Sequence, residues 1–131
     1  MSSRARKILC GALMTLGFAA LVGCNTPQIP LPPPLIDAIR LSVVDATQHL
    51  VVIEGKADTV TGRAIVRVRN QSTGFGVFAP ANSDGSFVTG PLVAADGARL
   101  LIDYELDAEP SEVLCVVANY TSELGVSSCK D

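Results

Sequence analysis

The chain has no tryptophan and only one histidine, His49, among its 131 residues. It also lacks a Cys-x-x-Cys pair and any serine in a Gly-x-Ser-x-Gly context. A single histidine is a poor basis for a metal site. It is also the one histidine that could act as a general base to activate a catalytic nucleophile. The sequence therefore predicts no catalytic residues, no metal site and no cofactor, and we expect a non-enzymatic protein with His49 at the surface.

Basic residues are scarce after the first few positions. The whole chain has 10 Lys and Arg residues against 13 Asp and Glu, and three of the ten precede residue 8. Residues 24–131 therefore carry 7 basic and 13 acidic groups, a net charge of −6. Because affinity for nucleic acid comes mainly from Lys and Arg at phosphates, no nucleic-acid partner is expected. The same sign disfavours docking on anionic lipid.

A basic start and a short apolar run mark the amino terminus as an export signal. Arg4, Arg6 and Lys7 precede a 15-residue apolar run over residues 8–22. This order is typical of a signal peptide. The run is too short to span a bilayer comfortably, because a spanning helix needs about 20 apolar residues.

The end of that run, Leu21-Val22-Gly23-Cys24, resembles the lipobox of bacterial lipoprotein precursors. The resemblance implies cleavage between Gly23 and Cys24 and attachment of lipid, with acyl chains such as palmitate, to Cys24. Two or three acyl chains hold a protein on a membrane, because each buried CH₂ contributes roughly 0.8 kcal/mol. Asn25 favours the outer membrane, by resemblance to sorting in some Gram-negative bacteria, with the protein facing the periplasm or the cell surface. The alternative is an ordinary secretory signal with a coincidental cysteine.

Five prolines among residues 25–34 predict a tether between the lipidated cysteine and the folded domain. Proline fixes φ and lacks an N–H donor, so we expect the segment not to pair in a sheet. A polyproline II stalk would extend about 3.1 Å per residue. The predicted organisation is a signal peptide over residues 1–23, a tether over residues 24–38 and a domain over residues 39–131. A docking peptide for an aromatic groove is the alternative role for the prolines.

From Ile39 onward, apolar side chains recur at every second position and are separated by turn signals such as Asp96-Gly97. This alternation predicts strands, and no amphipathic helix is expected. About eight short strands favour an all-β fold, a small antiparallel β-sandwich that is immunoglobulin-like or transthyretin-like. The predicted strands cover residues 40–44, 50–54, 64–70, 74–79, 86–89, 99–107, 113–120 and 126–129.

Residues 51–106 are similar to bacterial immunoglobulin-like and carboxypeptidase-regulatory-like sandwich modules of surface proteins. The resemblance implies a structural spacer or an adhesion or glycan-binding unit without catalytic residues. Without tryptophan, the Cys, Trp, Cys signature of antibody domains is absent. The similarity is carried by turn and core positions: Val52, Gly55, Gly62-x-Ala64-x-Val66-x-Val68-x-Asn70, Thr73-Gly74, Asp84-Gly85-Ser86-Phe87, Asp96-Gly97 and Leu100-x-Ile102.

Two of the four cysteines predict one disulfide. Cys10 leaves with the signal peptide and Cys24 carries lipid, so Cys115 and Cys129 remain as a pair in an oxidising envelope. If they face each other in an antiparallel hairpin, the numbers of paired residues sum to 244. The other expected pairs are Val117 with Ser127 and Asn119 with Gly125.

Alternating carboxylates form the clearest charge pattern of the chain. On one strand they would share a face. One interpretation is a stripe for a cation or a basic ligand. The favoured one is a solvated face, opposite the arginines of another strand, Arg63, Arg67 and Arg69. The carboxylates are Asp103, Glu105, Asp107 and Glu109.

The loop of residues 82–86 has oxygen-bearing side chains and a glycine, which superficially suggests calcium. It offers one carboxylate, Asp84, whereas Ca²⁺ takes six to eight oxygen ligands. We therefore interpret the loop as a hairpin turn.

Three function classes stay open. The favoured one is a membrane-anchored envelope lipoprotein whose sandwich is a structural or protein-binding module. A glycan-binding or adhesion module is weaker, because sugar rings stack on exposed aromatic side chains and this chain has only two Tyr and four Phe. A small periplasmic inhibitor would present the loop of residues 120–126 in the disulfide-closed hairpin.

Replacing the lipidated cysteine tests the anchor. We expect Cys24→Ser to release the protein from membranes and to abolish incorporation of labelled fatty acid, because the acyl chains supply the membrane affinity. Membrane fractionation and fatty-acid labelling measure both. Unchanged membrane association of this variant would contradict the lipoprotein assignment.

Overall fold

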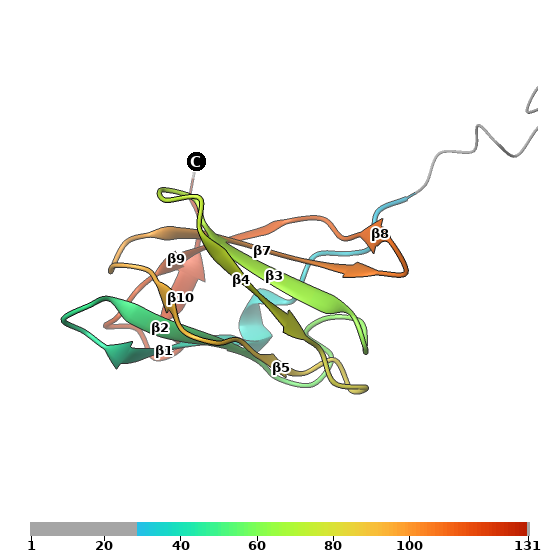
Figure 1. The fold of residues 1–131 in the computed structure, drawn as a ribbon, viewed down its shortest axis with the longest axis horizontal. Coiled ribbons are helices and arrows are strands. Elements are labelled where there is room, and N and C mark those ends of the chain that lie inside the picture. Colours follow the sequence, from blue (N-terminus) through green and yellow to red (C-terminus); the bar gives the residue numbers. More distant parts are fainter. Residues whose placement is uncertain (1–28, 131) are drawn as a thin grey trace, which may run out of the picture.

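The computed structural model describes residues 29–130, so the predicted signal peptide, Gly23, Cys24 and Asn25 lie outside the described residues. The described part is built of antiparallel strands in two sheets, with one short 3₁₀ turn, η2, at Ile36–Ala38 (Figure 1). This confirms the predicted all-β sandwich. No helix within residues 29–130 is long and apolar enough to cross a membrane. The strands are β1 (Ile39–Asp45), β2 (Leu50–Gly55), β3 (Ile65–Asn70), β4 (Gly76–Pro80), β5 (Phe87–Val88), β6 (Leu92–Val93), β7 (Arg99–Leu106), β8 (Glu109–Pro110), β9 (Leu114–Ala118) and β10 (Val126–Ser128).

The smaller sheet has the order β1-β2-β5, and β6 also pairs with β2. The larger sheet has the order β10-β9-β7-β3-β4, and β8 pairs with β7. All eight predicted strands are present, with ends that differ by at most two residues. The sequence did not predict β6 and β8, which have two residues each.

The core lies between the inner faces of the sheets, and the period-two pattern explains which residues fill it. Successive side chains of a strand point to opposite faces, so alternate apolar residues point inward. Phe87 is the largest of the fully buried side chains, and a side chain at its cross-strand partner Gly55 would collide with the phenyl ring. The other largest buried side chains belong to Ile39, Ile53, Leu100, Ile102, Val51, Val66, Val68, Val116 and Thr59.

The C-terminal hairpin has the predicted register. Ser127 pairs with Val117, and the Asn119 N–H donates to the Gly125 carbonyl at 2.8 Å. Cys115 and Cys129 form the predicted disulfide, with their Cα atoms 5.5 Å apart. This spacing suits both a directly opposed antiparallel pair and a disulfide.

The same hairpin also joins the two sheets. The Leu41 N–H of β1 donates to the Leu124 carbonyl at 2.9 Å. Gly125 has φ +78°, and a Cβ there would overlap the Leu41 carbonyl oxygen. Only glycine therefore allows the chain to pass so close to β1.

The proline-rich segment is not wholly a free stalk. Leu31 forms a parallel bridge with Ser111, donating its N–H to the Pro110 carbonyl and accepting the Glu112 N–H at 2.8 Å. Farther along, the Leu35 N–H donates to the Thr59 carbonyl at 3.1 Å. The prediction that this segment does not pair in a sheet is wrong at Leu31. Its neighbours Pro30 and Pro32 have no N–H, but Leu31 has one and can donate it. The end of the predicted tether is therefore docked on the domain from Leu31 onward.

The predicted stripe of four carboxylates on one strand is also wrong. β7 ends at Leu106, and Asp107 and Ala108 form a two-residue turn with φ +52° and +67°. Glu109 then lies on β8, opposite Leu106. Two positive φ values are typical of a tight type I′ hairpin, in which Asp-Gly is the usual pair. Alanine in the second position hid this turn from the sequence pattern.

Glycine at this position should stabilise the domain. A non-glycine residue in the left-handed region costs roughly 1–2 kcal/mol, so we expect Ala108→Gly to raise the free energy of unfolding by about 1 kcal/mol. Denaturant titration measures the change. The matched control is Ala46→Gly, because Ala46 lies in another exposed turn but does not have a positive φ. This substitution should not raise the free energy of unfolding. Destabilisation by Ala108→Gly would contradict this account of the turn.

Candidate functional site

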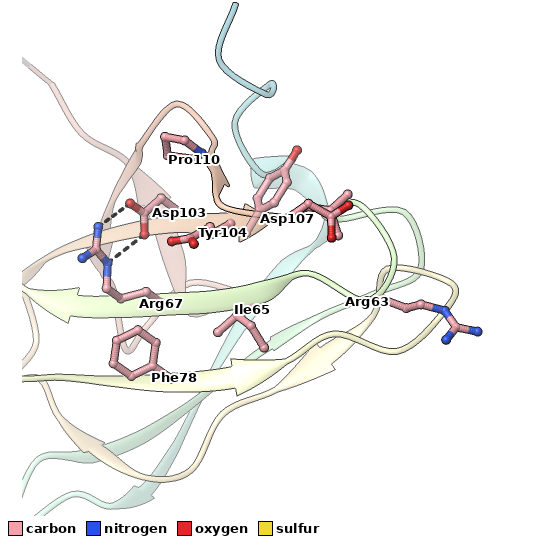
Figure 2. Close-up of a pocket in the computed structure, with 10 residues that line it drawn as sticks. Arg63, Ile65, Arg67, Phe78, Asp103, Tyr104, Asp107 and Pro110 are labelled. Atoms are coloured by element: carbon pink, nitrogen blue, oxygen red, sulfur yellow. Dashed lines mark hydrogen bonds and ion pairs between the residues drawn. The ribbon is translucent and has the colours of Figure 1, made fainter. Parts of the chain in front are cut away.

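The outer face of the larger sheet brings side chains from β3, β4 and β7 into rows across the strands (Figure 2). The antiparallel register defines both rows. One row contains Phe78, Arg67 and Asp103, and the next contains Pro80, Ile65, Glu105 and Pro110.

A shallow hollow of about 310 Å³ lies over these rows. Ile65, Phe78 and Pro110 give it apolar walls, and Glu105 and Asp107 line it with carboxylates. The Phe78 residue is 70% exposed and Ile65 is 47% exposed. Large apolar side chains therefore stand in solvent beside charged ones.

Arg67 and Asp103 form a bidentate ion pair in this face. Arg67 Nε donates to Asp103 Oδ1 at 3.0 Å, and Arg67 Nη2 donates to Asp103 Oδ2 at 2.6 Å. The hydrogen bond to Asp103 raises the pKa of the Arg67 guanidinium above its ordinary value, against a smaller opposing effect of burial. Because each group satisfies the other, the pair presents no free charge to a ligand.

The arginines and carboxylates meet only in part as predicted. Arg67 faces Asp103, but Arg69 lies opposite Leu101, and Arg63 precedes β3 with φ +67°. Figure 2 shows the Arg63 side chain pointing away from the pair. Asp103 is only 8% exposed, so the expected solvated face is wrong at this position.

The other candidate residues lie apart from this face. His49 is exposed in the turn between β1 and β2, with φ +58°. A turn precedes Phe87, where the Asn82 N–H donates to the Ser86 carbonyl at 2.8 Å, but the predicted hairpin is wrong because β4 and β5 lie in different sheets. Hydrogen bonds from the Ser86 hydroxyl and N–H lower the pKa of Asp84. Within residues 29–130, no three His, Cys, Asp or Glu side chains gather as a metal site.

The loop of residues 120–126 is fastened to the domain. The Tyr120 hydroxyl donates to the Ala94 carbonyl, and the Tyr120 N–H donates to Asp96 Oδ1 at 3.0 Å. Leu124 packs against the core. Burial, and to a smaller extent the Asp96 charge, raise the pKa of Tyr120. The loop is thus held in place, but only Thr121 and Glu123 of its residues are exposed, so it presents little surface for an inhibitor.

The main-chain edge of β4 is the feature that residue-by-residue analysis missed. The Ala81 N–H donates to Ala64 and the Phe75 carbonyl accepts from Asn70, so odd-numbered residues of this segment bond to β3. In an antiparallel pair, the alternate residues direct their N–H and C=O groups away from that partner. Gly76, Phe78 and Pro80 therefore form an edge, and β4 is the terminal strand of its sheet. Because successive side chains of a strand point to opposite faces, the sequence of residues 74–79 could have shown that Phe78 points outward where Val77 and Ala79 point inward.

Comparison of the chain with protein-family models, with curated proteins and with solved structures finds no match. The site is therefore interpreted from its own geometry.

A double-mutant cycle measures how strongly the ion pair supports this face. Exposed pairs contribute about 0.2–1 kcal/mol and fully buried ones more, so we expect a coupling energy of about 1 kcal/mol between Arg67→Ala and Asp103→Ala. Unfolding of both single variants and the double variant gives the value. Asp103→Ala should be the more destabilising single change, because Asp103 is the more buried partner. Additive effects would show that the pair does not hold the face.

Proposed function

We propose that this chain is a non-enzymatic, lipid-anchored envelope protein whose sandwich binds another protein through β4. The observation that carries the binding role is an exposed phenylalanine, Phe78, on a strand edge that pairs with no other strand of residues 29–130. We use the name β4 surface for Ile65, Phe78 and Pro80 together with the free main-chain groups of Gly76, Phe78 and Pro80.

Both the side chains and the free main-chain groups of the β4 surface are suited to protein recognition. Complete burial of a phenylalanine side chain contributes about 1.5–3 kcal/mol, and aromatic side chains are common anchors of interfaces. The free N–H and C=O groups can pair with an extended segment, as in β-strand addition. Natural edge strands usually carry charges or prolines that prevent such pairing. Residues 71–83 contain no charged residue, and their one proline, Pro80, is the last residue of β4.

A protein partner fits the β4 surface better than a glycan. Phe75 is 80% exposed, but it precedes β4, in which Phe78 is the one aromatic residue. The outer face therefore offers Phe78 alone for stacking on a sugar ring. The nearest polar groups, Arg67 and Asp103, already satisfy each other.

The attachment of the tether supports the anchored arrangement. The chain enters the domain beside β8, at Leu31 (Figure 1). Seven residues, 24–30, separate this point from the anchor, and at about 3.1 Å per residue they span about 22 Å. The domain would therefore stay close to the lipid. Cys10→Ser, inside the segment to be removed, is the matched control for the Cys24→Ser test.

A photo-crosslinking amino acid at position 78 of the full chain tests the binding role in intact cells. We expect discrete protein adducts from position 78, because a bound partner buries Phe78. The same probe at Val88, a 62% exposed position on β5, is the control and should give none. Ile65→Ser should weaken the adducts from position 78. Equal labelling from both positions, or none from position 78, would contradict the proposal.

A further inference from the structure

We infer that the partner of the β4 surface is a second copy of this chain, bound by antiparallel pairing of the two β4 edges with Phe78 at the two-fold axis. This inference rests on the proposed function, because it names the partner of the same surface. A two-fold interface requires the same patch on both copies to be complementary to itself. The β4 surface meets this requirement in its hydrogen-bonding groups, its shape and its charge.

The order of donors and acceptors along the edge limits the possible registers. With Phe78 opposite Phe78 of the second copy, the two residues exchange two N–H···O=C bonds. Gly76 then lies opposite the second copy's Pro80, and its N–H donates to that carbonyl. Proline has no N–H to donate, so each Gly76–Pro80 pair has one bond. The register therefore provides four main-chain hydrogen bonds.

Among the other symmetric registers, one centred on Val77 also gives four bonds, because Gly76 and Phe78 of the two copies then pair with each other, and the rest are poorer. Centring on Pro80 places two residues without N–H groups opposite each other, and no bond forms at the axis. Centring on Gly76 places Phe78 opposite Gly74, which precedes β4 and has φ +79°. The registers centred on Phe78 and on Val77 both keep every bonded residue within Gly76–Pro80, but only the register centred on Phe78 places the two Phe78 residues directly opposite each other.

Side chains and charge favour a second copy in that register. The two Phe78 rings would stand next to each other across the axis, and aromatic pairs attract beyond the area that they bury. Gly76 has no side chain to obstruct the second copy's Pro80 on this face. β4 has no charge to repel itself, and in the adjacent strand Arg67 is neutralised by Asp103. The pairing would join two six-stranded sheets into one continuous sheet.

The first test traps this contact with a disulfide in the full chain in its own envelope. An antiparallel hydrogen-bonded pair in this domain, Cys115 and Cys129, already carries a disulfide with Cα atoms 5.5 Å apart. Because Phe78 would meet its copy in the same kind of pair, Phe78→Cys should give a covalent dimer under mild oxidation. Val88→Cys, similarly exposed on β5, is the control and should stay monomeric. Gels without reductant distinguish the two.

The second test uses charge at the axis, with two differently tagged copies expressed together, crosslinked in intact cells and then purified in mild detergent. Wild-type copies should co-purify, and either F78K or F78D in both copies should reduce co-purification at least tenfold, because like charges then face each other. F78K in one copy with F78D in the other should restore it. Val88→Lys in both copies controls for added charge and should change nothing.

The outcomes separate this inference from the proposed function. A Phe78→Cys dimer of twice the chain's mass, together with recovery in the mixed F78K and F78D pair, supports the second copy. Adducts from position 78 with a different protein, without self-dimer, would overturn the second copy but leave a protein-binding β4 surface. Absence of any adduct would overturn both. Co-purification that survives F78K in both copies would place self-association elsewhere and overturn the inference.

Discussion

The unpaired edges of its two sheets are the constraint on which this small sandwich depends. An edge strand exposes N–H and C=O groups that must find partners or face water. On one side, Leu41 of β1 bonds to Leu124, in the hairpin that Cys115 and Cys129 close. At β8, Leu31 adds its own main-chain bonds. The free groups of β4 receive no such cover within residues 29–130, so the architecture itself directs attention to this edge.

The predictions that succeeded depended on local pattern or on elimination. Alternation located the strands because burial on one face imposes a period of two. The C-terminal register followed from one assumption, that Cys115 and Cys129 are paired, because one fixed pair in an antiparallel hairpin determines all others. The outward position of Phe78 was available from the same alternation, but its importance was not, because that depends on β4 being terminal in the sheet.

The predictions that failed concerned contacts between distant segments or unusual backbone. Nothing near Leu31 in the sequence indicates that Ser111 is its partner, and its proline neighbours favour a stalk. The turn at Asp107 and Ala108 places alanine at a positive φ, where the usual sequence signal is glycine. Asp103 looked like one member of a solvated series, but its pairing with Arg67 comes from the β3–β7 register, which a single strand does not reveal.

The proposed anchor and the proposed edge pairing also reinforce each other. Pairing at β4 would rest on four main-chain bonds and two phenyl rings, a small contact that would be weak between freely diffusing domains, because association costs translational and rotational freedom. An anchor on Cys24 would hold every copy in the same thin layer, and linked partners meet at a raised effective concentration. Leu31 is bonded to the body of the domain, seven residues after the proposed anchor at Cys24. A short, docked tether therefore favours weak edge pairing at the membrane that would be largely absent once the domain is released.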